Sequence, residues 1–125
     1  MRPLLILGTV IVLTVPALQA CARPNPLIGV WNVDQARMTQ WQRDHGGCPN
    51  SRFTFRPASQ TVHTDSIAGM AARDSTSPVT YNTAGGDYVY VIGATYVSQP
   101  TKWRFVDAKH IVEASLTDCP YVRAG

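Results

Sequence analysis

The sequence predicts a mainly β protein, a small antiparallel barrel or sandwich with one short α-helix near its N-terminal side. Three observations lead to this prediction. Short segments of alternating apolar and polar residues recur at roughly ten-residue spacing after residue 27, with turn residues between them. Charged residues make up only 15% of the chain, and Thr, Ser, Tyr and Val, which suit strands, fill the later part. One segment alone, residues 34–45, has a helical pattern.

The N-terminal segment reads as a secretory signal. Met1-Arg2-Pro3 carries a positive charge, Leu4–Val15 is almost wholly apolar, and Pro16-Ala17 interrupts the run before small residues follow. The apolar run is shorter than the ~20 residues that a transmembrane helix needs, so a retained membrane helix or a buried core helix is the weaker alternative.

Leu18-Gln19-Ala20-Cys21 resembles the lipobox of bacterial lipoproteins. The resemblance implies that residues 1–20 are removed and that Cys21 becomes an acylated N-terminus, held in the membrane by several acyl chains. Because Ala22 rather than Asp follows, it also implies the outer membrane, with the protein facing the periplasm. Cleavage after Ala22, which would release a soluble protein, is the alternative. Residues 21–26 would form a lipidated tether and residues 27–125 a single β-rich domain.

The mature chain carries little net charge and two further cysteines. Without Arg2, ten Lys and Arg stand against eight Asp and Glu, a balance of +2 that does not favour nucleic acid as a partner. With Cys21 assigned to lipid, Cys48 and Cys119 are expected to form a disulfide in an oxidising compartment. Two free buried thiols are the alternative, and a metal site is weaker still.

The first half of the domain is expected to contain strands around one helix. Asp34 suits the N-cap of a helix that ends near His45. One face of this helix is expected to pack on the sheet through Met38, Trp41 and His45. Residues 66–77 are undecided between a helical turn and a loop. The predicted strands are Leu27–Val33, Ser51–Arg56 with Phe53 and Phe55 inward, and Gln60–Thr64.

The second half is expected to be entirely β. Residues 79–82 and 87–92 form a hairpin around Ala84-Gly85-Gly86, and the second of these strands is expected to be central, with both faces covered. The remaining predicted strands are Ala94–Val97, Lys102–Val106 with Trp103 and Phe105 inward, His110–Glu113 and Cys119–Arg123.

Gly29-Val30-Trp31 at the start of the first strand resembles the Gly-x-Trp signature of lipocalin-like barrels, which also opens small bacterial inhibitor lipoproteins. The resemblance implies that Trp31 plugs the barrel floor and that an Arg from the last strand, here Arg123, lies over the indole. The alternative is a Trp that merely fills a core.

Catalytic and metal-binding patterns are weak throughout. His63 and Asp65 share a strand face, so the two could bind a metal together, but a histidine exposed at the surface is the better interpretation. There is no Gly-x-Ser-x-Gly elbow, Glu113 is the sole Glu, and Gly85-Gly86 precedes no helix that would hold phosphate. We therefore expect no enzymatic activity, no cofactor and no metal.

The predicted lipid anchor and the weakness of the catalytic and metal-binding motifs together favour a non-catalytic module. Such a module would bind another envelope or secreted protein, or support an envelope assembly. In an inhibitor of this kind, residues 66–78 would be the inserting loop. The alternative is a lipocalin-like carrier of a small hydrophobic ligand, with a cavity lined by Phe53, Phe55, Tyr90 and Trp103.

Overall fold

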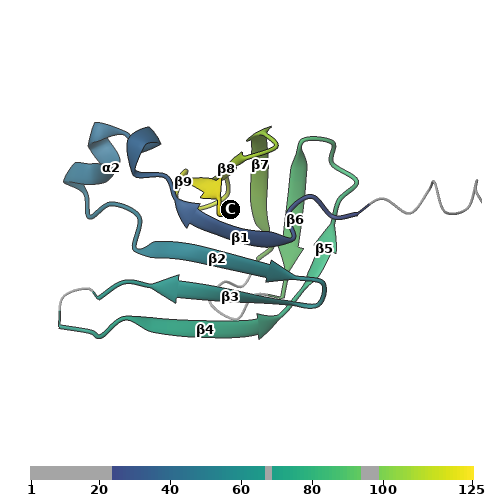
Figure 1. Cartoon of the computed structure of the whole chain (residues 1–125), viewed down its shortest axis with the longest axis horizontal. Helices are drawn as coiled ribbons and strands as arrows, with labels where there is room; N and C mark the ends of the chain where they lie inside the picture. The colour runs from purple at the N-terminus through teal and green to yellow at the C-terminus, as the bar shows by residue number, and fades with distance from the viewer. Residues whose placement is uncertain (1–23, 67–68, 94–98) are drawn as a thin grey trace, which may run out of the picture.

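In the residues that the structure describes, nine antiparallel strands form one sheet that curls into a nearly closed barrel (Figure 1). The structure is a computed structural model and describes residues 24–66, 69–93 and 99–125. The strand order is β4-β3-β2-β1-β9-β8-β7-β6-β5. The prediction of a mainly β fold with one short helix is confirmed, and the architecture is the barrel rather than the sandwich.

The strands lie close to the predicted positions in most of the chain. β1 spans Gly29–Val33, β2 Asn50–Arg56, β3 Ser59–Thr64, β4 Arg73–Pro78 and β5 Thr80–Asn82. β6 spans Tyr88–Ile92, β7 Thr101–Asp107, β8 His110–Glu113 and β9 Pro120–Arg123. The predicted strand Ala94–Val97 lies outside the described residues.

The barrel is brought toward closure at one corner, where a single stretch of chain supplies both ends of the sheet. β4 pairs with β3 along its whole length, and β5 pairs with β6. Val79, which separates β4 from β5, is buried and donates its N–H to the carbonyl of Ala58 at 3.0 Å. The chain therefore bends at Val79 and joins the two ends of the sheet covalently.

The interior is filled mainly by side chains that alternate inward along each strand. Phe53 and Phe55 are buried as predicted, and both rings pack edge-on against Trp103, at 4.7 and 5.3 Å between centroids. Tyr121 contacts Phe53 and Trp103 in the same way. Edge-to-face aromatic pairs of this kind add to the area they bury, so this cluster is the centre of the core.

The predicted helix over residues 34–45 is wrong in extent and in its buried face. The structure has a short 3₁₀ helix η1 at Gln35–Arg37 and an α-helix α2 at Gln40–Asp44, separated by extended backbone. Asp34 makes no side-chain cap. Met38 is buried, but Trp41 and His45 are exposed, and Gln42 takes the buried position instead. The stripe is split because the N-cap of α2 is Thr39, which shifts the helix register.

Two further predictions are corrected. Residues 73–78, expected as part of a loop or helical turn, form strand β4, whose backbone pairs with β3 from Ser59 to Thr64. β6 is not covered on both faces: Val89 and Val91 point inward, whereas Tyr88 and Tyr90 are only half-buried and Ile92 is exposed. The barrel wall is a single layer here, so the outer face of β6 has no second sheet to cover it.

Candidate functional site

Trp31, Gly29 and Arg123 form one cluster at the end of the barrel where the chain enters β1. Trp31 is fully buried, and its indole N–H donates to the carbonyl of Leu27 at 2.9 Å. The Arg123 guanidinium lies over the indole at 4.2 Å from the ring centroid. Trp31 and Arg123 are also direct register partners in the β1–β9 pair. The arrangement that the Gly-x-Trp resemblance implied is therefore present.

Gly29 is required by this arrangement for two independent reasons. Its φ of 139° lies in a region that L side chains rarely adopt, and a Cβ there would lie 2.8 Å from Nη1 of Arg123. The same guanidinium donates to the carbonyls of Pro26 at 2.7 Å and Ile28 at 3.1 Å. Arg123 thus fixes the segment before β1 to the last strand, which is a structural role.

The cavity expected for a hydrophobic carrier is not formed by the residues predicted to line it. Phe53, Phe55 and Trp103 are in mutual contact in the core, and Tyr90 alternates with the inward Val89 and Val91 on the other face of β6. These side chains fill the interior where the carrier prediction needed space.

Two of the three histidines, His63 and His110, lie on the barrel wall beside carboxylates. The Nδ1 atom of His63 is 2.7 Å from Asp74, and its Nε2 atom is 3.7 Å from Asp65. Because the two carboxylates contact opposite nitrogens of one ring, they do not converge on a common point. Among the residues described, no three His, Cys, Asp or Glu side chains could together hold a metal ion.

The other two histidines and the sole Glu have local structural contacts. Nδ1 of His110 lies 2.8 Å from the Asp107 carboxylate. A hydrogen bond from the backbone N–H of Lys109, together with the contact to His110, holds the pKa of Asp107 below its usual value. The carboxylate of Glu113 is buried and accepts the backbone N–H groups of residues 115 and 116. His45 is treated below.

The first candidate binding surface is the end of the barrel that carries α2, named here the helix end: residues 34–48 together with 114–119. Trp41 is 67% exposed and Leu116 62% exposed. The Trp41 ring stacks on His45 at 4.2 Å between centroids, with 15° between the planes. Two large apolar side chains are therefore presented to solvent at one end of the molecule.

The helix end is fixed to the barrel by several bonds. Thr39 and Gln42 cap the start of α2 reciprocally, at 3.0 and 3.1 Å. The Gln42 amide then donates to the carbonyls of Thr117 and Asp118. The Cys48–Cys119 disulfide, which confirms the predicted pairing, joins the same two segments. The signal for the cap was present in the sequence as Thr-x-x-Gln, whereas the contact of Gln42 across 75 residues had no local signal.

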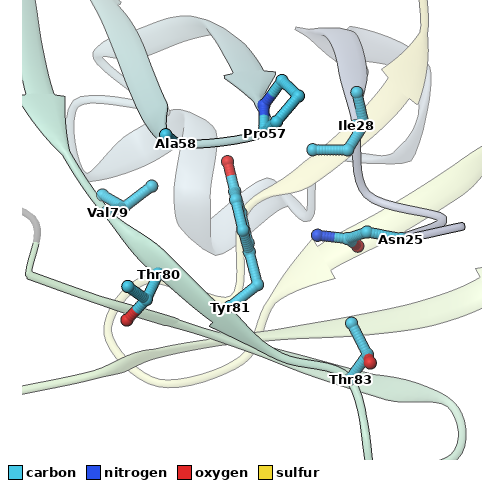
Figure 2. A pocket seen from close by; sticks show the side chains of 8 residues that line it. All are labelled: Asn25, Ile28, Pro57, Ala58, Val79, Thr80, Tyr81 and Thr83. Carbon is cyan, nitrogen blue, oxygen red and sulfur yellow. The ribbon is translucent and has the colours of Figure 1, made fainter.

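The second candidate is an open pocket of about 490 Å³ at the opposite end of β1, named here the Asn25 pocket (Figure 2). Its walls come from the segment before β1, the β2–β3 turn and the β4–β5 corner. The lining residues are Asn25, Ile28, Pro57, Ala58, Val79, Thr80, Tyr81 and Thr83. Nothing in the sequence indicated this pocket, because its three segments are distant along the chain.

Tyr81 stands between the walls of the Asn25 pocket. Its hydroxyl donates to the carbonyl of Arg56 at 2.6 Å and also lies 3.2 Å from the carbonyl of Ser59. Figure 2 shows this hydroxyl directed at the turn that carries Pro57 and Ala58. Burial raises the pKa of Tyr81 to about 12, against a smaller opposing effect of the Arg56 charge. The phenol is therefore neutral near pH 7 and is a fixed part of the wall.

Cys21 and the whole predicted signal lie outside the described residues. None of the described helices has the length and apolar character that crossing a bilayer requires. The chain matches no protein-family model, no curated protein and no solved structure. Function must therefore be argued from the surfaces described above.

Proposed function

We propose that this protein is a lipid-anchored module of the bacterial envelope that binds another envelope or secreted protein at its helix end and performs no catalysis. The anchor is supported by the apolar segment and by Leu18–Cys21. The observation that carries the binding part is Trp41, a large aromatic side chain 67% exposed on a fixed helix. Tryptophans of this kind dominate the energy of many protein interfaces.

The rigidity of the helix end favours binding. Trp41 is held by its stack on His45, whose Nδ1 atom lies 2.8 Å from the Trp41 carbonyl oxygen. The helix itself is held by the Thr39–Gln42 cap and by the disulfide that follows. A side chain already fixed in place loses less conformational entropy on binding, so more of its contact energy remains as affinity.

The position of the helix end also suits a partner away from the membrane. The chain that would leave the anchor enters β1 at Gly29, and the helical segment follows the other end of β1, after Val33 (Figure 1). A barrel tethered through residues 21–26 would present Trp41 and Leu116 on the side away from its tether.

The predicted loop of an inhibitor needs revision under this proposal. Residues 73–78 belong to β4, so they are held in the sheet by β3 and are not free to insert into an enzyme cleft. The helix end takes over the role of the contact surface. The carrier alternative is not favoured for the barrel interior, because the aromatic cluster occupies it.

The test is site-specific photo-crosslinking of the full-length protein in living bacteria. A photoreactive residue replaces Trp41 in one variant and Val106, an exposed apolar residue on β7, in the control. We expect one protein adduct at position 41 and none at position 106. Recovery of the same protein on affinity purification should fall at least tenfold in Trp41→Ala and stay unchanged in Val106→Ala. Equal adducts at both positions, or no adduct at 41, would contradict the proposal.

A separate measurement tests the anchor. Cys21→Ser should move the protein from the membrane fraction to the soluble fraction, and mass spectrometry of the unaltered protein should find acyl chains on Cys21. An unmodified protein beginning at Arg23 would show instead that the chain is cleaved after Ala22 and released.

A further inference from the structure

We propose that the Asn25 pocket binds a small neutral acyl compound, an ester or amide whose carbonyl oxygen accepts a hydrogen bond from the side chain of Asn25. This inference concerns the end of the barrel opposite the helix end, and it does not depend on the partner proposed above.

The first observation is an unsatisfied donor beside the pocket. The Oδ1 atom of Asn25 accepts the N–H of Leu27 at 3.0 Å, which fixes the orientation of the amide. Its Nδ2 atom is shielded from solvent and has no hydrogen-bond partner among the residues that the structure describes. Figure 2 shows this nitrogen directed toward Tyr81. A buried donor without an acceptor destabilises the folded protein, so an acceptor supplied by a ligand would be favoured here.

The second observation is the chemistry of the walls. Ile28, Pro57, Ala58 and Val79 give apolar surface, and the Tyr81 hydroxyl is already used by main-chain carbonyls. The described lining contains no Lys, Arg, Asp or Glu. A charged carboxylate or amine would lose its hydration without gaining an ion pair, so the fitting ligand is neutral.

The third observation is size. A volume of about 490 Å³ lies within the range of small-molecule sites. The pocket is open on one side, so it accommodates a carbonyl and the first part of an apolar chain while the rest of the molecule extends outward. These features together specify a carbonyl group attached to a short apolar chain.

Two sources supply this chemistry near the pocket. One is a free lipid or other acyl ester. The other is the acyl group on Cys21, since four residues of extended chain span at most about 14 Å. The experiment below distinguishes them.

The probe is methyl octanoate, added to ¹⁵N-labelled full-length protein in detergent micelles and followed through the side-chain NH₂ signal of Asn25. Sodium octanoate and octyl methyl ether are the comparison compounds. We expect saturable shifts with the ester, binding about tenfold weaker with the charged acid, and binding several-fold weaker with the ether, because one neutral hydrogen bond contributes about 0.5–1.5 kcal/mol.

Two variants test the site. Asn25→Asp keeps the acceptor for the Leu27 N–H and removes the Nδ2 donor, so it should weaken ester binding at least tenfold. Ala58→Leu should narrow the pocket and weaken binding to a similar extent. Ala84→Leu, in the exposed β5–β6 turn, is the matched control and should bind like the unaltered protein. Circular dichroism and melting temperature check that each variant is folded.

The source is identified by comparing the acylated protein with Cys21→Ser. If the Asn25 signal of the acylated protein is already shifted and only Cys21→Ser binds the ester, the pocket holds the protein's own acyl group. If both proteins bind the ester, free acyl compounds are the ligand. If neither the ester nor acylation moves the Asn25 signal, the proposal is wrong. The photo-crosslink expected at position 41 does not depend on this pocket, so the failure of one proposal would not imply the failure of the other.

Discussion

Removing the Cys48–Cys119 disulfide should lower the melting temperature by roughly 15–30 °C. The bond closes a loop with a sequence separation of 71 residues. In the chain-entropy model, a loop of this length stabilises the folded state by about 4 kcal/mol, because the reduced unfolded chain has more conformations to lose. For a domain of about 100 residues, 1 kcal/mol corresponds to roughly 4–8 °C in melting temperature.

The variant for this test is Cys48→Ala/Cys119→Ala, which leaves no lone thiol in the core where both cysteines are buried. Thermal unfolding is followed by circular dichroism, with and without a reducing agent. We expect the reductant to lower the melting temperature of the unaltered protein to near that of the double variant, and to leave the variant unchanged. Cys48→Ser alone should be at least as destabilising.

Folding kinetics show whether the two cysteine segments are already joined in the folding transition state. If they are, removal of the disulfide should mainly slow refolding, and if they are not, it should mainly speed unfolding. A fall in melting temperature of less than about 5 °C would refute the reasoning from loop length.

Three further predictions concern single side chains. Trp31→Ala should lower the free energy of unfolding by about 3–5 kcal/mol in urea titrations, whereas Trp41→Ala on the exposed helix should change it by less than about 0.5 kcal/mol; equal effects would contradict the assignment of Trp31 to the core. Gln60 is fully buried, and neither of its amide atoms has a hydrogen-bond partner in the described part of the chain. Gln60→Leu should therefore raise the free energy of unfolding by about 1–3 kcal/mol, and a loss of stability would show that water satisfies the amide. Tyr81 should ionise with a pKa of about 12 instead of 10.0. In absorbance titrations, its signal is the part of the tyrosinate absorbance that Tyr81→Phe removes. Because its folded pKa is raised, its contribution to stability is complete below pH 10 and is lost as the pH rises toward 12, and ionisation near 10 would contradict its burial.

The sequence predicted the strands whose side chains alternate between core and solvent. β2 and β7 are examples, with Phe53, Phe55 and Trp103 at every second position. β4 escaped prediction because Arg73–Pro78 holds no apolar side chain apart from its final proline, and Ser77 alone among its residues is buried. Its strand conformation comes from backbone pairing with β3. A side-chain contact between the hydroxyls of Thr61 and Thr76, at 2.9 Å, adds to this pairing.

The candidate surfaces were harder to foresee. The spacing of Trp41 from Met38 fits one helix and predicts that both pack on the sheet, but α2 begins at Gln40, so Met38 lies outside it. Local spacing cannot show where a short helix starts when two caps, Asp34 and Thr39, compete. The Asn25 pocket depends on three segments that meet only in the folded barrel. The Trp31–Arg123 contact was anticipated through resemblance rather than spacing.

The place of β9 within the sheet has a consequence for when the protein can fold. β9 is the last of the nine strands to be synthesised, yet it lies between β1 and β8 and joins the two halves of the barrel. A growing chain that has reached residue 110 can pair β2 with β3 and β6 with β7. It cannot link these two hairpins through the sheet, because β9, the strand that pairs with both β1 and β8, has not yet been made. Contacts so distant along the chain also slow folding. The barrel is thus completed only after β9 has been made, which is compatible with the proposed export across a membrane before folding.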